Sequence, residues 1–180
     1  RFAVLCPPHL VEQWLCELDD RFHIRAVAVT AGNAARLERG LPATENIFTV
    51  FPFTVVSLDY IKSDSRRGDF VSRCPELVIV DEAHTCAGTG VGRHQRHDLL
   101  RLLAADAHRH MLFLTATPHS GDETGFHKLL GLLKPEFSQL QTLTGNARDR
   151  LRERLASHFV QRQRVDIGEW HDSGIFPRRQ

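Results

Sequence analysis

Two adjacent carboxylates and a histidine follow a short apolar run near the middle of the chain. Residues 78–80 (Val-Ile-Val) lead directly into Asp81 and Glu82, and His84 follows two residues later. Carboxylate oxygens are preferred ligands of Mg²⁺, and a carboxylate can also orient or deprotonate a water that attacks a γ-phosphate. Since successive side chains of a strand point to opposite sides, Asp81 and Glu82 are expected to have separate tasks. The pattern predicts one carboxylate for a metal ion and the other for water.

Two other interpretations of the same residues stay open. An isolated Asp-Glu pair is most often the solvated start of a loop. Alternatively, Asp81, Glu82 and His84 could be ligands of a hydrolytic or redox metal, although successive strand residues diverge and do not readily converge on one ion. Metal analysis of the purified protein would separate this last interpretation from the first.

Five short apolar runs alternate with helical patterns, and these elements must position the polar residues. Continuous apolar runs are typical of parallel strands that are covered by helices on both faces. The runs lie at residues 2–6, 26–29, 54–58, 77–80 and 111–114. Apolar residues recur at helical spacing within residues 10–18, 99–103 and 126–133. This order predicts an open α/β sheet with right-handed crossovers.

Ligands of open α/β sheets bind beyond the carboxyl ends of the strands, so the residues after each run are candidate site residues. The first run is followed by Pro7, Pro8 and His9, where Pro8 suits the first turn of a helix and free backbone N–H groups could hold an anion. A simple strand-to-helix turn explains these residues equally well. The third run ends around Ser57, and the fifth is followed by residues 115–119.

Composition indicates one soluble globular domain. The chain has 180 residues, of which 42% are hydrophobic and 25% charged, and its formal net charge is +1. Residues 145–180 hold eight Arg against five Asp or Glu, a net charge of +3 that indicates a basic C-terminal end. The four cysteines form no Cys-x-x-Cys pair, which argues against a zinc ribbon or a secreted disulfide framework. No apolar run approaches the roughly 18 residues of a membrane span. A chain that begins with Arg1 is expected to be a fragment of a longer protein.

Four short stretches resemble, in the same order, the motifs of superfamily-two helicases and translocases. Residues 81–84 (Asp-Glu-Ala-His) resemble motif II, the Walker B box, and residues 114–118 (Leu-Thr-Ala-Thr-Pro) resemble motif III. Residues 55–60 resemble motif Ib. The resemblance to motif Ia of the Swi/Snf-type branch is carried by residues 4–8, Leu10, Gln13 and Trp14. Residues 158–164 and 176–178 resemble the segment that leaves the first lobe in bacterial Swi/Snf-like ATPases, including the polymerase-recycling kind.

The resemblance implies a RecA-like α/β fold, with an open, mostly parallel sheet, helices on both faces and an incomplete N-terminus. Residues 1–160 would be a partial N-terminal lobe, and residues 161–180 a basic segment that leads toward a second lobe. The implied activity is that of a DNA-dependent ATPase that uses ATP and Mg²⁺ to move along double-stranded DNA or to remodel protein–DNA complexes. Its implied partners are duplex DNA and RNA polymerase or other DNA-bound proteins. Its implied location is the bacterial cytoplasm, in association with the nucleoid and without a membrane.

The resemblance also implies roles for the residues that match the motifs. Asp81 would hold Mg²⁺ of the Mg-ATP complex, and Glu82 would be the catalytic residue that positions the hydrolytic water. His84, Thr115 and Thr117 would couple the state of the nucleotide to movement of the lobe.

The DNA-contacting residues implied by motifs Ia and Ib form a second group. Backbone and side chains near Pro7, Pro8, His9 and Ser57 would touch DNA phosphates, contacts that position a protein without reading sequence.

Part of the family pattern is missing. Walker A, G-x-x-x-x-G-K-[ST], should precede motif Ia, and none of the 12 glycines is followed by lysine. Residues 88–93 (Gly-Thr-Gly-Val-Gly-Arg) lack the lysine and are expected to form a flexible loop after motif II. The second lobe and its arginine are missing too, so residues 1–180 alone are expected to hydrolyse no ATP. A non-catalytic DNA or protein docking lobe therefore stays open as an alternative, although the intact Asp81 and Glu82 count against it.

Two further patterns favour structural interpretations. The pairs His94/His97 and His108/His110 could suggest a metal, but this spacing alone is weak evidence and solvated or core histidines explain it better. In residues 148–154, four Arg alternate with Asp149 and Glu153, which is typical of a solvated helix face. A nucleic-acid contact is the second interpretation of that helix.

Overall fold

The computed structural model describes residues 1–87, 91–117 and 123–161. The chain forms two compact units, residues 1–138 and residues 139–180. The first unit contains all strands of the described residues, and α8 (Gly145–Ala156) belongs to the second. The predicted basic segment 161–180 lies, apart from its first residue, outside the described residues.

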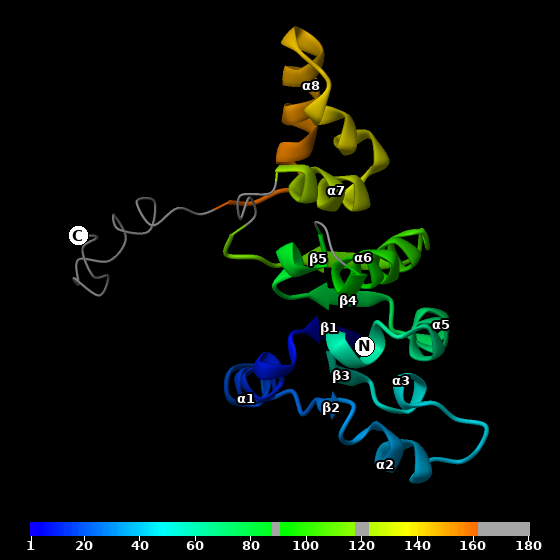
Figure 1. Cartoon of the computed structure of the whole chain (residues 1–180). Coiled ribbons are helices and arrows are strands. Elements are labelled where there is room, and N and C mark those ends of the chain that lie inside the picture. Colours follow the sequence, from blue (N-terminus) through cyan, green and yellow to red (C-terminus); the bar gives the residue numbers. More distant parts are fainter. Residues whose placement is uncertain (88–90, 118–122, 162–180) are drawn as a thin grey trace, which may run out of the picture. The chain divides into compact units, whose positions relative to one another are not determined.

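The first unit is built on a sheet of five parallel strands in the order β2-β3-β1-β4-β5 (Figure 1). The strands are β1 (Phe2–Cys6), β2 (Val27–Val29), β3 (Phe53–Ser57), β4 (Leu77–Val80) and β5 (His110–Phe113). Each begins and ends within one residue of its predicted apolar run. The α/β fold with a parallel sheet is thereby confirmed. Because the strands are parallel, the carboxyl ends of β1, β3, β4 and β5 lie along the same side of the sheet. The candidate residues follow these strand ends.

The predicted helical segments all lie in helices. These are α1 (Val11–Phe22), α6 (Val91–Ala104), α7 (Glu123–Leu133) and α8. The further elements are η1 (Pro8–Leu10), α2 (Ala34–Arg39), α3 (Ile47–Val50), α4 (Leu58–Ile61), α5 (Asp64–Arg73), η2 (Ala83–Cys86) and η3 (Pro135–Gln141). Among the described residues, no helix has both the length and the apolar character that crossing a membrane requires.

Helix α6 corrects the expectation of a flexible loop at residues 88–93. The helix begins at Val91, so residues 91–93 are helical, while residues 88–90 lie outside the described residues. Leu99, Leu100 and Leu103 are completely buried in the core. Packing of an apolar helix face stabilises a helix more than local propensity does, and this helix has such a face in its second half.

Side chains of the strands alternate between two cores, one on each face of the sheet. Ala3 and Leu5 of β1 pack in a large core that includes Phe70 of α5 and the leucines of α6. Val4 and Cys6 pack in a smaller core against Val11 and Leu18 of α1. The prediction of helices on both faces is therefore confirmed.

The edge strand β5 departs from the prediction of a run buried on both sides. Met111 and Phe113 pack against the large core, but Leu112 is 49% exposed and His110 is also exposed. Helix α1 packs on β2 and β3, which lie at the opposite end of the strand order from β5. Periodicity in the sequence cannot show this, because the exposure follows from the position of β5 at the sheet edge.

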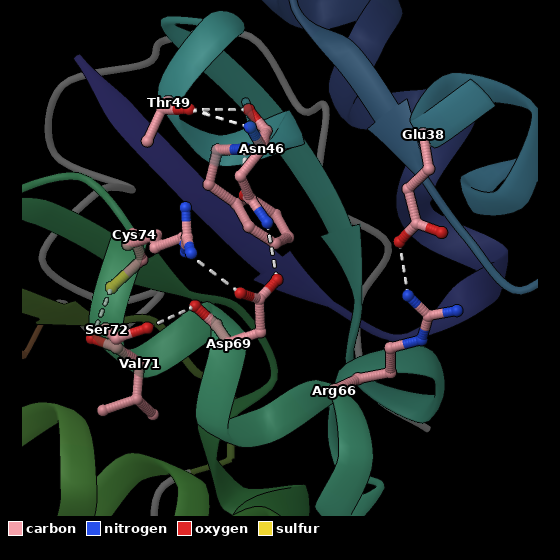
Figure 2. Close-up of polar contacts among 10 residues, drawn as sticks. Glu38, Asn46, Thr49, Arg66, Asp69, Val71, Ser72 and Cys74 are labelled. Carbon is pink, nitrogen blue, oxygen red and sulfur yellow. Dashed lines mark hydrogen bonds and ion pairs between the residues drawn. The ribbon is translucent and has the colours of Figure 1, made fainter. Parts of the chain in front are cut away.

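Polar contacts fasten the helices that follow β2 and β3 to one another (Figure 2). Arg66 of α5 forms an ion pair with Glu38 of α2, and its guanidinium lies 5.4 Å from the centre of the Tyr60 ring. Asp69, also in α5, accepts a hydrogen bond from the side chain of Asn46, which caps α3. These contacts join three short helices that would be marginal alone, and they support the segment that begins at the end of β3.

Candidate functional site

Backbone hydrogen bonds hold residues 81–83 between β1 and the segment after β5. The N–H of Asp81 donates to Leu5 O over 2.8 Å, and the N–H of Ala83 donates to Leu114 O over 2.9 Å. These bonds continue the pairing of the strands beyond the end of β4. The residues that follow β4 are therefore held next to β1, whose residues 3–6 are completely buried.

The Asp81 carboxylate accepts one hydrogen bond on each oxygen. The backbone N–H of Glu82 donates to Oδ1 over 2.8 Å, and the indole N–H of Trp14 in α1 donates to Oδ2 over 2.8 Å. Each carboxylate oxygen has a second lone-pair direction, so both can still bind a cation or its water. Oxygen ligands of this kind suit Mg²⁺, and the residue fits the predicted metal-binding role. The Trp14 contact was not predicted, because it joins residues 67 positions apart.

Glu82 adopts a left-handed backbone conformation, with φ 49° and ψ 44°. The strand therefore does not continue through this residue, and the alternation of a pleated strand is the wrong reason for separating the two carboxylates. They are separated nonetheless, because the turn directs Glu82 toward His84 while Asp81 contacts Trp14. A non-glycine residue in this conformation costs about 1 kcal/mol or more, and such strain concentrates at functional sites.

One oxygen of the Glu82 carboxylate has no hydrogen-bond donor. Oε2 is buried, and although His84 Nδ1 lies 3.1 Å away, the pair does not have hydrogen-bond geometry. A buried acceptor without a donor is costly, and water or a ligand that donates to it recovers that cost. Among the described residues, Glu82 Oε2 is thus an acceptor that no hydrogen-bond donor satisfies.

His84 connects the segment after β4 to the segment after β5. Its Nδ1 is 3.0 Å from Thr115 Oγ1, and the same hydroxyl oxygen accepts a hydrogen bond from the Thr117 N–H over 3.2 Å. The three residues predicted to couple nucleotide state to movement therefore form one chain of contacts. Thr117 takes part through its backbone, and its side chain is exposed. The coupling role itself stays a prediction.

The residues predicted to contact DNA lie at the neighbouring ends of β1 and β3, where Cys6 pairs with Ser57 in the sheet. Pro8 begins η1 as expected, and Pro8 and His9 are exposed. Pro7 is buried, and Ser57 is only 3% exposed. Of the four predicted residues, Pro8 and His9 are the two that can present their side chains to a partner.

Sequence reasoning missed a polar link between the residues predicted for ATP hydrolysis and those predicted to contact DNA. Arg96 of α6 donates a hydrogen bond to Asp59 Oδ1 in α4 over 2.7 Å, and its Nη1 lies 3.5 Å from Thr85 O in η2. Hydrogen bonds from Arg96 and then Lys62 hold the pKa of the Asp59 carboxyl below its ordinary value. The link joins the segment after β3 to the segment after β4. Nothing in the sequence marks it, because Arg96 has the spacing of a solvated helix residue.

The alternative of a metal-dependent hydrolase gains no support from this arrangement. In the part of the chain that the structure describes, no three His, Cys, Asp or Glu side chains come together in a group that could hold a metal ion. This includes the pairs His94/His97 and His108/His110. Asp81 and Glu82 instead face different partners, as two separate tasks require.

Comparison with known proteins agrees with the geometry. The SNF2-related domain family matches residues 1–157. The RNA polymerase-associated protein RapA of Proteus mirabilis is 28% identical over 131 residues, which are 72% of this chain and 13% of RapA. RapA of Yersinia enterocolitica is 27% identical over 137 residues, 76% of this chain and 14% of that protein. The chain thus spans about one seventh of the length of these relatives. The match over residues 1–157 shows that the chain belongs to the SNF2-related domain family, and its sheet of five parallel strands agrees with that assignment.

Proposed function

We propose that the chain is the part of an ATP-dependent double-stranded-DNA translocase that supplies the hydrolytic half of the ATP site. The observation that supports this most directly is the arrangement of Asp81 and Glu82 at the end of β4. Their carboxylates face different partners, and the buried Glu82 Oε2 has no hydrogen-bond donor. Hydrolysis of a γ-phosphate needs a group that holds the Mg²⁺ ion and a group that orients the attacking water, and two carboxylates with different partners can fill these two tasks.

In this proposal Asp81 binds Mg²⁺ of Mg-ATP through the lone pairs that Trp14 and Glu82 leave free. The metal, when bound, neutralises charge on the phosphate oxygens. Glu82 accepts a hydrogen bond from the attacking water with its carboxylate and orients it. His84 and Thr115 pass the change at this site to the segment after β5 through their 3.0 Å contact.

The DNA-binding part of the proposal rests on the exposed Pro8 and His9 in η1. They would touch phosphates of duplex DNA, whereas the buried Pro7 and Ser57 would position the backbone around them. RNA polymerase is the first candidate for a protein partner, because the RapA relatives are named RNA polymerase-associated proteins. A role on DNA and polymerase would place the protein in the bacterial cytoplasm, at the nucleoid.

Residues 1–180 alone are proposed to be inactive, because neither a glycine-lysine phosphate cradle nor a second lobe is in their sequence. The test therefore uses the full-length protein. Wild type is expected to hydrolyse ATP faster with linear duplex DNA than without it. Glu82→Gln should lower this DNA-stimulated rate by about two orders of magnitude or more, since a positioned acid or base contributes about that much.

The matched control is Glu76→Gln, the same substitution at an exposed residue just before β4. It should keep the wild-type rate. An unchanged rate in Glu82→Gln would contradict the assignment of Glu82. Absence of ATP binding and hydrolysis in the wild type would favour the non-catalytic docking lobe instead.

A further inference from the structure

The indole of Trp14 is the unexpected partner of the Asp81 carboxylate. It donates to Oδ2 over 2.8 Å, from the first turn of α1 to the residue after β4. An indole N–H can only donate, so this contact exists only when Oδ2 is free to accept. Hydrogen bonds to a charged partner are among the stronger ones in proteins, and they fix the rotation of a carboxylate.

The surroundings of Trp14 hold the indole in place. Trp14 is partly buried and packs against the smaller core, whose members include Val11 and Leu18 of the same helix. Residues on that face of α1 lie against β1 and β3. This packing fastens the indole to α1, so a shift of the helix would move the indole relative to the Asp81 carboxylate.

The position of α1 is set by the segment that precedes it. Helix α1 begins at Val11, directly after η1, whose Pro8 and His9 are exposed. Only four residues separate His9 from Trp14. A displacement of η1 by a ligand would therefore move the indole relative to Asp81, which is tied separately to β1 through its backbone N–H.

We propose that Trp14 is a positioning residue for the metal site: it orients the Asp81 carboxylate and transmits displacements of η1 to it. This inference rests on the proposed function and deepens it. In this proposal, DNA phosphates that bind at Pro8 and His9 shift the first turn of α1. The shift changes the hydrogen bond from Trp14 to Asp81, and with it the affinity of Asp81 for the cation.

The test measures Mn²⁺ binding to the full-length protein by electron paramagnetic resonance, in the presence of a non-hydrolysable ATP analogue. Trp14→Phe removes the N–H and keeps most of the ring packing. Loss of such an orienting partner typically weakens a metal site about 10- to 100-fold, so we expect Mn²⁺ affinity to fall about tenfold. Duplex DNA should change the Mn²⁺ affinity of wild type and leave that of Trp14→Phe unchanged.

Leu15→Ala is the control for packing, because Leu15 is a partly buried neighbour in the same core and makes no contact of this kind. It should retain the Mn²⁺ affinity. Equal Mn²⁺ affinity in wild type and Trp14→Phe, or equal losses in Trp14→Phe and Leu15→Ala, would overturn the inference and leave the proposed function intact. Absence of Mn²⁺ binding in the wild type with nucleotide would overturn both.

Discussion

The ends of β4 and β5 differ in kind from the ends of β1 and β3, although all four lie along the same edge of one parallel sheet. At β4 and β5, side chains lie against one another: Glu82 Oε2 is 3.1 Å from His84 Nδ1, and the same nitrogen is 3.0 Å from Thr115 Oγ1. At β1 and β3, Pro7 and Ser57 are buried and only Pro8 and His9 reach the surface. The first region is specified by side-chain chemistry and the second by the course of the backbone. Substitutions of single side chains should therefore affect the first region more.

Apart from substitutions of the two carboxylates themselves, the largest effect in this comparison is expected from Thr115→Val, which keeps the shape of the side chain and removes the hydroxyl. His84 Nδ1 and the Thr117 N–H then both lose their contact with Oγ1. Two lost contacts at about 1 kcal/mol each amount to about 2 kcal/mol, so DNA-stimulated ATP hydrolysis by the full-length protein should fall about 30-fold. ATP binding, measured by equilibrium dialysis, should stay unchanged. A variant that keeps its DNA-stimulated rate would show that this contact carries no coupling.

The next largest effect concerns the backbone at Glu82. Both Glu82→Gly and Glu82→Ala remove the carboxylate, but only glycine adopts φ 49° without strain. The glycine variant should be more stable than the alanine variant by about 1 kcal/mol. Pulse proteolysis in urea, followed through peptides of this lobe, measures the difference.

The same pair of substitutions at Asp81 is the matched control. Asp81 does not have a positive φ. There the order should reverse, because glycine in an ordinary backbone conformation costs about 0.5–1 kcal/mol relative to alanine. The same order at both positions would mean that the left-handed turn at Glu82 stores no strain.

The smallest effects are expected at the ends of β1 and β3. His9→Ala should weaken binding of a labelled DNA duplex by about threefold in fluorescence anisotropy at fixed salt, since a single contact to phosphate contributes little. Ser57→Ala should leave the affinity unchanged, because the hydroxyl is buried. A larger loss in Ser57→Ala than in His9→Ala would reverse the distinction between the two regions.

The positions of the strands and the identities of the polar residues at their ends could be predicted from the sequence, because both are local properties. Apolar runs gave all five strands to within one residue, and the motifs placed Asp81, Glu82 and His84 at a strand end. Predictions from the sequence were wrong for features that depend on the position of an element in the tertiary structure. Leu112 is exposed on β5, which is the last strand of the described sheet, and the glycine-rich residues 88–93 do not indicate that α6 begins at Val91.

The partners of the candidate residues were the least predictable part of the site. Trp14 lies 67 residues from Asp81, and Asp59 lies 37 residues from Arg96. No spacing rule for a helix or strand connects residues so far apart. The backbone of Glu82 was also missed, since glutamate does not favour a left-handed conformation and strain of this kind leaves no mark in the sequence.

The central claim is that Asp81 and Glu82 perform separate tasks, and the comparison of Asp81→Asn with Glu82→Gln in the full-length protein tests it most directly. Both variants are examined for Mn²⁺ binding with a non-hydrolysable ATP analogue and for hydrolysis of ATP in a single turnover with DNA. We predict that Asp81→Asn loses Mn²⁺ binding under conditions that saturate the wild type, whereas Glu82→Gln retains Mn²⁺ and nucleotide and fails only in hydrolysis. Equal loss of Mn²⁺ binding in both variants would contradict the claim.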